Sequence, residues 1–371
     1  MRPGRTLVWR LPAVAALVAI GLQGAFSLAV TTGAADVSGT VEKITVHGAS
    51  LERALAGYSA DREVYVYLPP SYASSPAQRY PVVYSLHGFG GSAQSWVQRL
   101  GAPETIDRAI AAGAREMIVV VPDGRTPMGG VMFSSSATTG DWETFIAHDL
   151  VACIDAHYRT LASRESRGLT GFSMGGYGAL RIAMKRPDVF GSVYAMSSCC
   201  LPPQITPVPA PGALDGFASM EKIKTPEQAG ALGFGAVPFA MAAAWSPNPA
   251  NPPMYLDLPV KDGTPQAHVI AAWAANAVLP MVHQYIPALR SLEAIAFDVG
   301  TQDGLRADHD KLHALLDAYG IRHHYETYEG GHGDQVAARF EQHVLPFFSG
   351  HLDVEPGPMR RQTCRMSTCV R

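Results

Sequence analysis

Residues 168–177 read GLTGFSMGGY, and residues 178–186 continue as GALRIAMKR. The stretch begins with a short strand pattern and passes directly into a helix pattern that ends before Pro187. Its centre, GFSMG, fits G-x-S-x-G, in which a serine occupies a strained turn between a strand and a helix. The pentapeptide is weak evidence by itself, since a glycine-rich turn with a bystander serine would also match it. The flanking strand and helix favour Ser173 as a nucleophile raised above a sheet.

Apolar strands and amphipathic helices alternate on both sides of this turn. The central strands are solidly apolar, which is typical of a parallel sheet covered by helices on both faces. The first two strands follow each other without a helix between them, so we expect an antiparallel pair at one edge. Strands are predicted at 41–46, 63–68, 80–86, 117–121, 168–172, 189–196, 294–299 and 322–328, and helices at 105–112, 142–158, 174–186, 305–319 and 335–348.

A histidine and an acid follow two later strands. A serine hydroxyl needs a base within hydrogen-bond reach, and in this type of fold the acid and then the histidine follow the serine along the chain. Asp303 lies in GTQDG, directly after a predicted strand, and His332 lies in EGGHGD, between the last predicted strand and the last helix. Both loops belong at the carboxyl edge of the sheet, so we predict Asp303 as the acid and His332 as the base for Ser173.

Acyl transfer also requires N–H donors for a developing oxyanion. Met174 directly follows the nucleophile and can supply one backbone N–H. The second donor is expected from HGFGG, residues 87–91, after the strand YPVVYSL, with Phe89 as the predicted residue. A generic glycine-rich turn is the alternative interpretation of that loop.

Composition and missing motifs exclude several functional classes. The 371 residues are 47% hydrophobic and 16% charged, which allows a sizeable core, and the net charge of −3 leaves no basic surplus for a nucleic-acid partner. The sequence contains no G-x-G-x-x-G after a strand, no G-x-x-x-x-G-K-[ST] and no H-E-x-x-H. We therefore expect chemistry without a cofactor or a metal ion.

Residues 1–35 have the layout of a secretory signal peptide. Arg2, Arg5 and Arg10 precede the apolar run LPAVAALVAIGL, and small residues follow it. An uncleaved N-terminal anchor is the alternative. No later apolar run approaches the length of a membrane span. The sequence therefore predicts an exported protein, secreted or held in the periplasm or cell envelope, with no stable membrane span after signal removal.

Two further segments stand apart from the predicted catalytic domain, residues 36–350. Residues 201–280 are rich in proline, alanine and glycine and are too long for a simple loop. We predict an insertion with short helices over the edge of the sheet, either a lid or a passive excursion. Residues 351–371 have little apolar content and are expected to form a flexible tail.

Five cysteines are present, so at least one thiol is free or pairs between molecules. Export would permit disulfides. A bond between Cys364 and Cys369, or between one of them and Cys199 or Cys200, is open, and Cys153 is the fifth.

Several segments together resemble one enzyme family. In chain order they are REVYVYLPPSY, YPVVYSLHGFGG, DWETFIAHDL, GFSMGGYGALRIAMKRPDVFG and EGGHGD, and they are similar to the esterase-D-type α/β-hydrolases. That group includes feruloyl esterases, enterochelin-type esterases, S-formylglutathione hydrolases and mycolyltransferases of the antigen 85 type. The resemblance covers most of residues 40–350 and is weakest across 201–280. It implies an α/β-hydrolase fold, with Ser173 as nucleophile, Asp303 as acid, His332 as base, and Phe89 and Met174 as oxyanion donors.

The expected function is that of an exported serine carboxylic-ester hydrolase working through an acyl-enzyme. An acyltransferase that passes the acyl group to a sugar or lipid alcohol is one alternative, and a non-catalytic binding protein on the same scaffold is another. The substrate is expected to be a small ester, while its acyl and alcohol groups and the oligomeric state are left open. Asp141 is expected to cap a helix, Trp142 to pack, and Asp123 to stabilise a turn.

Overall fold

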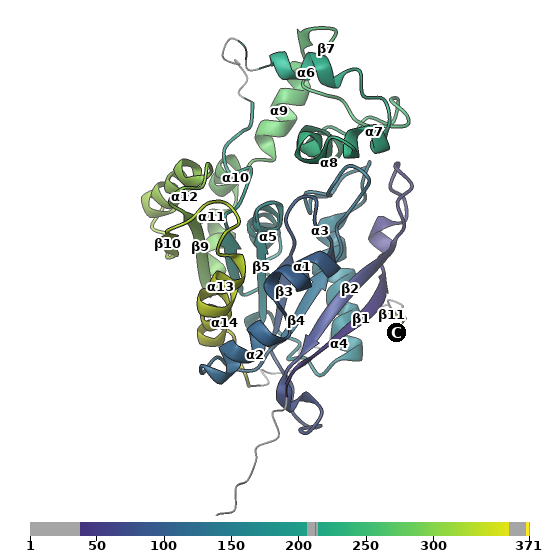
Figure 1. Cartoon of the computed structure of the whole chain (residues 1–371). Helices are drawn as coiled ribbons and strands as arrows, with labels where there is room; N and C mark the ends of the chain where they lie inside the picture. The colour runs from purple at the N-terminus through teal and green to yellow at the C-terminus, as the bar shows by residue number, and fades with distance from the viewer. Residues whose placement is uncertain (1–37, 206–211, 213, 356–368, 371) are drawn as a thin grey trace, which may run out of the picture. The chain divides into compact units, whose positions relative to one another are not determined.

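The computed structural model describes residues 38–205, 212, 214–355 and 369–370. Every feature below belongs to one compact unit, Val37–Arg371, which is the second unit of the structure (Figure 1). The predicted signal peptide, residues 1–35, lies outside the described residues. Within the described part of the chain, no helix combines the length and the apolar character that crossing a bilayer requires.

A mostly parallel sheet forms the centre of the second unit (Figure 1). Among the described residues its strand order is β10-β9-β6-β5-β3-β4-β2-β1-β11. The strands from β10 to β4 run parallel, whereas β2 pairs antiparallel with both β4 and β1, which confirms the predicted fold class and its antiparallel edge. The strands are β1 Thr40–His47, β2 Asp61–Leu68, β3 Val82–Leu86, β4 Ile118–Pro122, β5 Arg167–Phe172, β6 Ser192–Met196, β9 Ala294–Gly300, β10 His324–Tyr328 and β11 Cys369–Val370.

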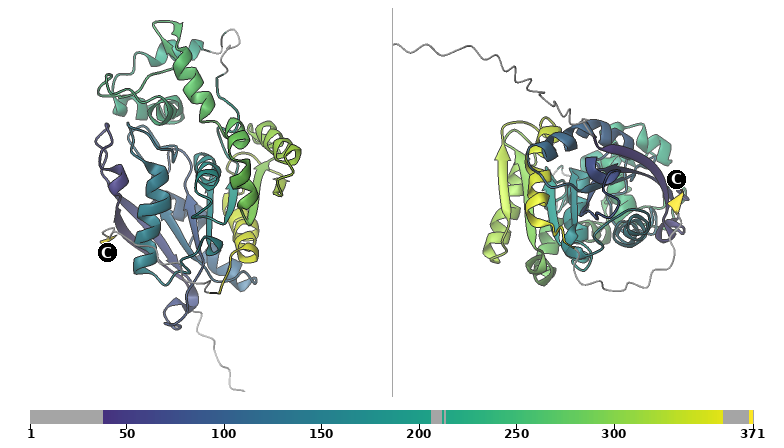
Figure 2. Two further views of the ribbon diagram at one scale, coloured as in Figure 1. Left: turned by 180° about the vertical axis from the view of Figure 1, so that it is seen from behind. Right: turned by 90° about the horizontal axis from the view of Figure 1, so that it is seen from below.

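Helices cover both faces of this sheet (Figures 1 and 2). Along β3 the side chains alternate, so that Tyr84 points into one apolar cluster and Val83 into the other. The Val83 face is covered by α1 Ala93–Leu100, α2 Glu104–Ala111, α13 Val336–Arg339 and α14 Leu345–His351. The Tyr84 face is covered by α3 Trp142–Thr144, α4 Val151–His157, α5 Met174–Lys185, α10 Val278–Gln284, α11 Ile286–Ser291 and α12 Arg306–Ala318.

Several details of the fold differ from the predictions, among them a π-helical segment, Phe340–Val344, within the predicted helix 335–348. The predicted helix 142–158 contains a π-helical segment, Phe145–Leu150, between α3 and α4. Helix α1 is absent from the predicted elements, although Ser92 caps it and Gly101 ends it with a φ of 65°. The tail was expected to be flexible, yet Cys369 and Val370 form β11 against β1, and residues 356–368 lie outside the described part.

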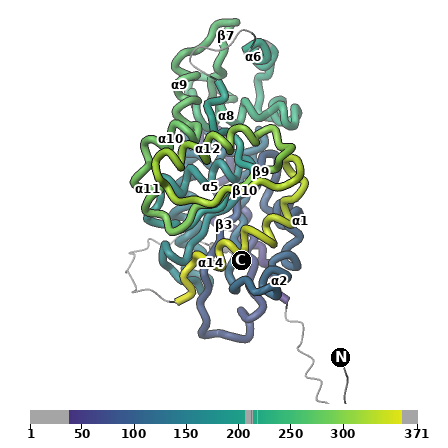
Figure 3. The backbone as a smooth tube through the Cα atoms, turned by 90° about the vertical axis from the view of Figure 1, so that its left-hand side faces the viewer, coloured from purple at the N-terminus to yellow at the C-terminus, as the bar shows by residue number. Residues whose placement is uncertain are grey.

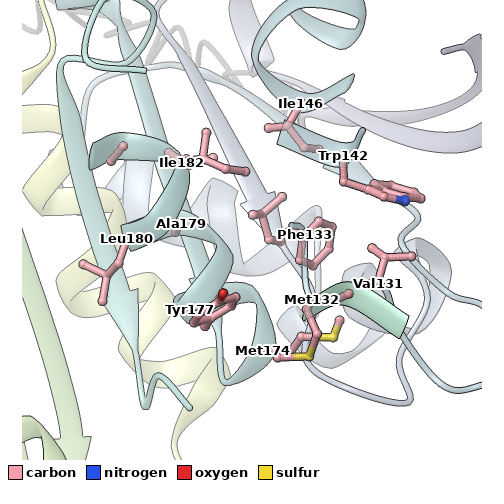
Figure 4. Close-up of a cluster of buried hydrophobic side chains, with 14 of the residues drawn as sticks. Val131, Met132, Phe133, Trp142, Ile146, Met174, Tyr177, Ala179, Leu180 and Ile182 are labelled. Carbon is pink, nitrogen blue, oxygen red and sulfur yellow. The ribbon is translucent and has the colours of Figure 1, made fainter. Parts of the chain in front are cut away.

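Helix α5 lies against the sheet at very short range. Figure 4 shows its residues Tyr177, Ala179, Leu180 and Ile182 within the buried cluster that also holds Phe133. A Cβ on Gly176 would lie 3.0 Å from the carbonyl oxygen of Met196, the last residue of β6, and one on Gly178 would lie 2.6 Å from the Cβ of Phe133, in the loop after β4. The small residues that follow Ser173 therefore allow the close approach that fixes the turn at Ser173.

Short elements fill the segment predicted as an insertion. They are α6 Asp215–Met220, α7 Pro226–Gly230, α8 Val237–Trp245, β7 Val260–Lys261, β8 Thr264–Pro265 and α9 Ala267–Ala275 (Figures 1 and 3). Their aromatic core is continuous with α5, because Trp245 lies 5.6 Å from Tyr177 and 5.8 Å from Trp273, ring centre to ring centre. The segment is thus packed onto the helix that begins at the predicted nucleophile.

Cys153 differs from Cys199 and Cys200 in its oxidation state. Cys153, buried on α4, is disulfide-bonded. Cys199 and Cys200 are free thiols in the turn after β6. A bond from the tail to Cys199 or Cys200, one of the pairings that the sequence leaves open, is therefore not formed.

Candidate active site

Ser173 sits at a strained turn between β5 and α5. Its φ and ψ are 55° and −112°, in a region that residues with a Cβ rarely occupy. The glycines around it are obligatory, because a Cβ on Gly175 would lie 2.0 Å from the carbonyl oxygen of Leu86. The Ser173 N–H donates to the carbonyl of Met196 at 2.9 Å, which ties the turn to the end of β6.

The structure brings Ser173, His332 and Asp303 together. The Nε2 atom of His332 lies 2.9 Å from the Ser173 hydroxyl oxygen, and Nδ1 lies 2.9 Å from a carboxylate oxygen of Asp303. Since a carboxylate only accepts, Nδ1–H donates to Asp303, and the unprotonated Nε2 accepts the hydroxyl proton of Ser173. The geometry suits proton removal from the serine.

The loop that carries His332 connects β10 to α13 and is held from two sides. The Gly331 N–H donates to the Asp334 carboxylate at 2.7 Å, and the Arg99 guanidinium donates to the Gly333 carbonyl at 2.8 Å. The Phe172 ring lies 4.9 Å from the imidazole, centre to centre. These contacts fix the direction of the ring while its outer edge stays open to substrate.

Asp303 follows β9 and is shielded from solvent. Burial raises the pKa of its carboxyl, but the hydrogen bonds from His332 and from the Leu305 N–H outweigh burial and hold the pKa below its ordinary value. The group is therefore a carboxylate at neutral pH and can stabilise a protonated His332.

The side chains of Phe89 and Met174, the predicted oxyanion donors, both pack against the loop that contains Gly129 and Gly130. A Cβ on Gly129 would lie 2.4 Å from the Phe89 ring, and one on Gly130 would lie 2.5 Å from the Met174 sulfur. Met174 is the first residue of α5, so its N–H has no acceptor within the helix. The Gly90 N–H donates to the Gly129 carbonyl at 3.0 Å and fastens the Phe89 loop at this position.

His87 is a residue of this region to which the sequence analysis assigned no role. It is fully buried at the end of β3, and burial lowers its pKa, so the ring is neutral. Nδ1–H donates to the Gly88 carbonyl at 2.8 Å, and Nε2 accepts from the Gly124 N–H at 2.9 Å. His87 therefore joins the Phe89 loop to the end of β4. In the sequence, His87 could have been found as a polar residue that directly follows a solidly apolar strand.

The segment Asp141–Trp142–Glu143 supports α5. Asp141 caps α3 as expected, accepting from the Thr144 N–H at 3.1 Å, and Trp142 is buried in the core. Glu143 is buried and accepts from Arg181 and Lys185 of α5, each at 2.7 Å. Burial raises the pKa of Glu143, but the two cations outweigh it and lower the pKa.

Other polar groups lie apart from this constellation. Asp123 accepts from the Arg125 N–H at 2.6 Å, the expected turn-stabilising role, and lines a surface hollow of about 430 Å³ that includes none of Ser173, Asp303 and His332. Asp298 is buried in an ion pair with Arg339 at 2.8 Å. Within the described residues, one group has the donor atoms for a metal ion, namely His313, Asp317 and His323.

The chain matches the model of the Esterase family over residues 57–344. It is 37% identical over 139 residues to "Esterase Rv1288" of Mycobacterium tuberculosis, a match covering 36% of this chain and 28% of that protein. It is 33% identical over 130 residues to "Endo-1,4-beta-xylanase/feruloyl esterase" of Xylanibacter ruminicola, covering 34% of this chain and 18% of that protein. The chain thus spans less than a third of the length of these relatives.

Solved structures resemble it over most of its length. A ferulic acid esterase has a TM-score of 0.60 at 22% identity and covers 85% of this chain and 99% of its own. An S-formylglutathione hydrolase from Agrobacterium tumefaciens has a TM-score of 0.58 at 16% identity and covers 85% of this chain and 97% of its own. MPT51 from Mycobacterium tuberculosis has a TM-score of 0.56 at 15% identity and covers 85% of this chain and 99% of its own.

At these identities the structural likeness shows the fold, which is the α/β-hydrolase fold. The family match begins in the connection between β1 and β2, ends just before α14 and spans well over half of the chain. On that match, the chain belongs to the Esterase family.

Proposed function

We propose that this protein is a serine carboxylic-ester hydrolase and that Ser173, His332 and Asp303 are its catalytic triad. The observation that carries the proposal is the continuous pair of 2.9 Å contacts from the Ser173 hydroxyl through His332 to the buried Asp303. A serine hydroxyl in contact with an imidazole that a carboxylate orients is the arrangement that acyl transfer requires.

In the first half-reaction the Ser173 oxygen attacks the ester carbonyl carbon. Its proton passes to Nε2 of His332, and the Asp303 carboxylate stabilises the imidazolium that results. The negative charge on the carbonyl oxygen is stabilised by the N–H groups of Met174 and Phe89. The intermediate collapses with cleavage of the ester C–O bond, and the imidazolium gives its proton to the departing alcohol.

In the second half-reaction water takes the place of the alcohol. His332 accepts a proton from that water, the hydroxide oxygen adds to the acyl carbon, and the Ser173 oxygen leaves with the proton returned by the imidazolium. The carboxylic acid is released and the enzyme regains its starting state. Each step uses the same three side chains, so they act as a unit.

The relatives support ester chemistry, and a relative and several solved neighbours carry feruloyl or ferulic acid esterase in their names. The pattern of residues 1–35 supports export to the cell envelope or the medium. A small-molecule ester is the proposed substrate. The same site would perform acyl transfer if an alcohol reached the acyl-enzyme before water, which makes transferase activity the rival outcome.

The test is hydrolysis of p-nitrophenyl acetate by the wild type and by Ser173→Ala, with circular dichroism as the check of folding. We expect the variant to fold and to lose activity and labelling by a fluorophosphonate probe. Ser74→Ala, which changes an exposed serine in a surface turn, is the matched control and keeps both. Wild-type activity in folded Ser173→Ala would refute the nucleophile.

Hydrolysis and transfer are separated by adding a short alcohol to the same assay and quantifying acid and new ester. Acid as the main product at low alcohol concentration supports the hydrolase. New ester as the main product under those conditions would favour the acyltransferase. A wild-type protein that takes up no fluorophosphonate would indicate a binding protein.

A further inference from the structure

Two adjacent free cysteines lie in the turn after β6, next to the turn that contains Ser173. Cys199 and Cys200 follow β6, and their sulfur atoms are 2.8 Å apart. The Cys199 N–H donates to the carbonyl of Ser173 at 3.2 Å. The main chain that positions the serine is therefore hydrogen-bonded to the main chain that carries the two thiols.

The same turn also holds the segment that follows the insertion. The carbonyl of Cys200 accepts from the Val278 N–H at 3.3 Å, and the carbonyl of Leu201 accepts from the Leu279 N–H at 2.8 Å. Val278 is the first residue of α10. A change in the backbone of Cys199 and Cys200 would thus alter hydrogen bonds in two places, at Ser173 and at the start of α10.

The local conformation already brings the two sulfurs face to face. Cys200 has a φ of 59°, in the left-handed region that residues with a Cβ seldom adopt, and its side chain is buried. Cys199 is half-buried and so is open to a reagent from solvent. The thiol of Cys200 donates to the sulfur of Cys199, so the two sulfur atoms already face each other.

We propose that Cys199 and Cys200 form an oxidation site that closes to a vicinal disulfide and thereby alters the nucleophile turn. The co-reactant is a small disulfide compound. The Cys199 thiolate attacks one of its sulfurs, forming a mixed disulfide and releasing one thiol. Cys200 then attacks the Cys199 sulfur and releases the second thiol, so that the two cysteine protons end on the two products.

Closure cannot leave the backbone unchanged. Consecutive Cα atoms are about 3.8 Å apart across a trans peptide, below the roughly 4.4–6.8 Å that disulfides usually span. Because the peptide bond fixes that Cα–Cα distance, the torsion angles of Cys199 and Cys200 must change for the sulfurs to close from 2.8 Å to a bond of about 2.05 Å, and the Cys199 N–H that holds Ser173 lies next to these torsions. Disulfides formed outside the usual geometry are the more easily reduced, so the change is expected to be reversible.

The chemical half of the proposal is tested by mass spectrometry and needs no activity. Trypsin cleavage after Lys185 and Lys222 gives the fragment 186–222, in which Cys199 and Cys200 are the only cysteines. After treatment of the full-length protein with oxidised glutathione, we expect this fragment to have lost two hydrogens and to resist iodoacetamide. Before treatment it should take up two alkyl groups.

Three results would overturn the oxidation site. They are alkylation of both cysteines after treatment, two stable glutathione adducts on one fragment, and a cross-link from the fragment to a peptide that contains another cysteine. Cys199→Ser and Cys200→Ser each remove the second thiol, so neither variant should give the fragment that has lost two hydrogens.

The functional half rests on the proposed esterase activity and has its own readout. We expect oxidation to lower kcat/KM for p-nitrophenyl acetate by about tenfold, which corresponds to ~1.4 kcal/mol of transition-state stabilisation. Dithiothreitol should restore it, and Cys200→Ser should keep reduced wild-type activity and lose the response. An oxidised fragment with unchanged kcat/KM would refute the coupling to Ser173. A reduced wild type without any esterase activity would instead refute the proposed function.

Discussion

The carboxylate of Asp303 is almost fully enclosed, with 2% of its side-chain surface exposed, while the His332 ring that it holds is 40% exposed. The two groups are 2.9 Å apart. One end of the pair is therefore shielded from water, where a hydrogen bond to a charge is strong, and the other is open to a substrate. This asymmetry is what a triad needs, since the acid must not exchange with solvent and the base must reach the reacting atoms.

Asp303→Asn tests that relationship. An amide donates where the carboxylate accepts, so it favours the imidazole tautomer with its proton on Nε2, which cannot accept from Ser173. We expect kcat for ester hydrolysis to fall by about 10⁴-fold with a small change in KM. Asp308→Asn is the control, because Asp308 lies on α12 and pairs with Lys311. A loss below tenfold in folded Asp303→Asn would contradict the assignment.

Glu143→Gln tests whether the contacts of Glu143 with Arg181 and Lys185 on α5 stabilise the fold through charge. The pKa of Glu143 is lowered in the folded protein from 4.5, so its ionised form stabilises the fold above that pH, and this contribution is lost as the pH falls through the lowered pKa. We expect the variant to lose about 3 kcal/mol of unfolding free energy at neutral pH, because Arg181 is left buried without its partner.

The difference in unfolding free energy between wild type and Glu143→Gln should become smaller when urea unfolding is repeated at acid pH. A difference that stays constant from neutral to acid pH would show that shape, and not charge, explains the effect. Asp188→Asn, which removes an exposed carboxylate paired with Arg186, is the control and should change stability by no more than about 1 kcal/mol.

Gly175→Ala tests the close approach at the nucleophile turn. The added Cβ would lie 2.0 Å from the Leu86 carbonyl oxygen, which is backbone and cannot rotate away. We expect a loss of at least ~3 kcal/mol, at the upper end for overpacking, measured as the shift of the urea midpoint. Gly216→Ala on α6, where nothing lies within 4 Å, should be neutral or stabilising by up to ~1 kcal/mol. Equal stability of the two variants would contradict the steric argument.

The sequence was sufficient to place the parts of the site that follow strands. Ser173 and Asp303 follow the buried strands β5 and β9, His332 follows the partly exposed strand β10, and parallel strands bring their carboxyl ends to one edge of a sheet. The contacts that hold these loops could not be predicted in the same way. Arg99 reaches Gly333 across 234 positions of the chain, and no local pattern encodes such a pair.

The insertion was hard to predict for a different reason. Helix α8 reads VPFAMAAAW, is apolar on all sides and is buried, so it lacks the alternation that marks a surface helix. Helix α1 carries both a cap and a terminating glycine, Ser92 and Gly101, which are local signals that the sequence does contain. The opposed thiols of Cys199 and Cys200 depend on a backbone angle that the sequence pattern does not contain.

His87→Ala tests the link between the Phe89 loop and the end of β4. The substitution leaves the buried Gly124 N–H without the acceptor it now has in Nε2, at a cost of about 1–3 kcal/mol in stability. Because the ring also holds the Gly88 carbonyl, the Phe89 N–H should lose its fixed direction. Loss of one oxyanion donor lowers kcat by roughly 10²–10³-fold, so we expect a fall of up to about 10²-fold with KM nearly unchanged, measured on protein shown to be folded. His324→Ala, at an exposed position of β10, should alter neither quantity. If His87→Ala lowered stability and left kcat at the wild-type level, His87 would be a structural residue and the Phe89 loop would keep its position without it.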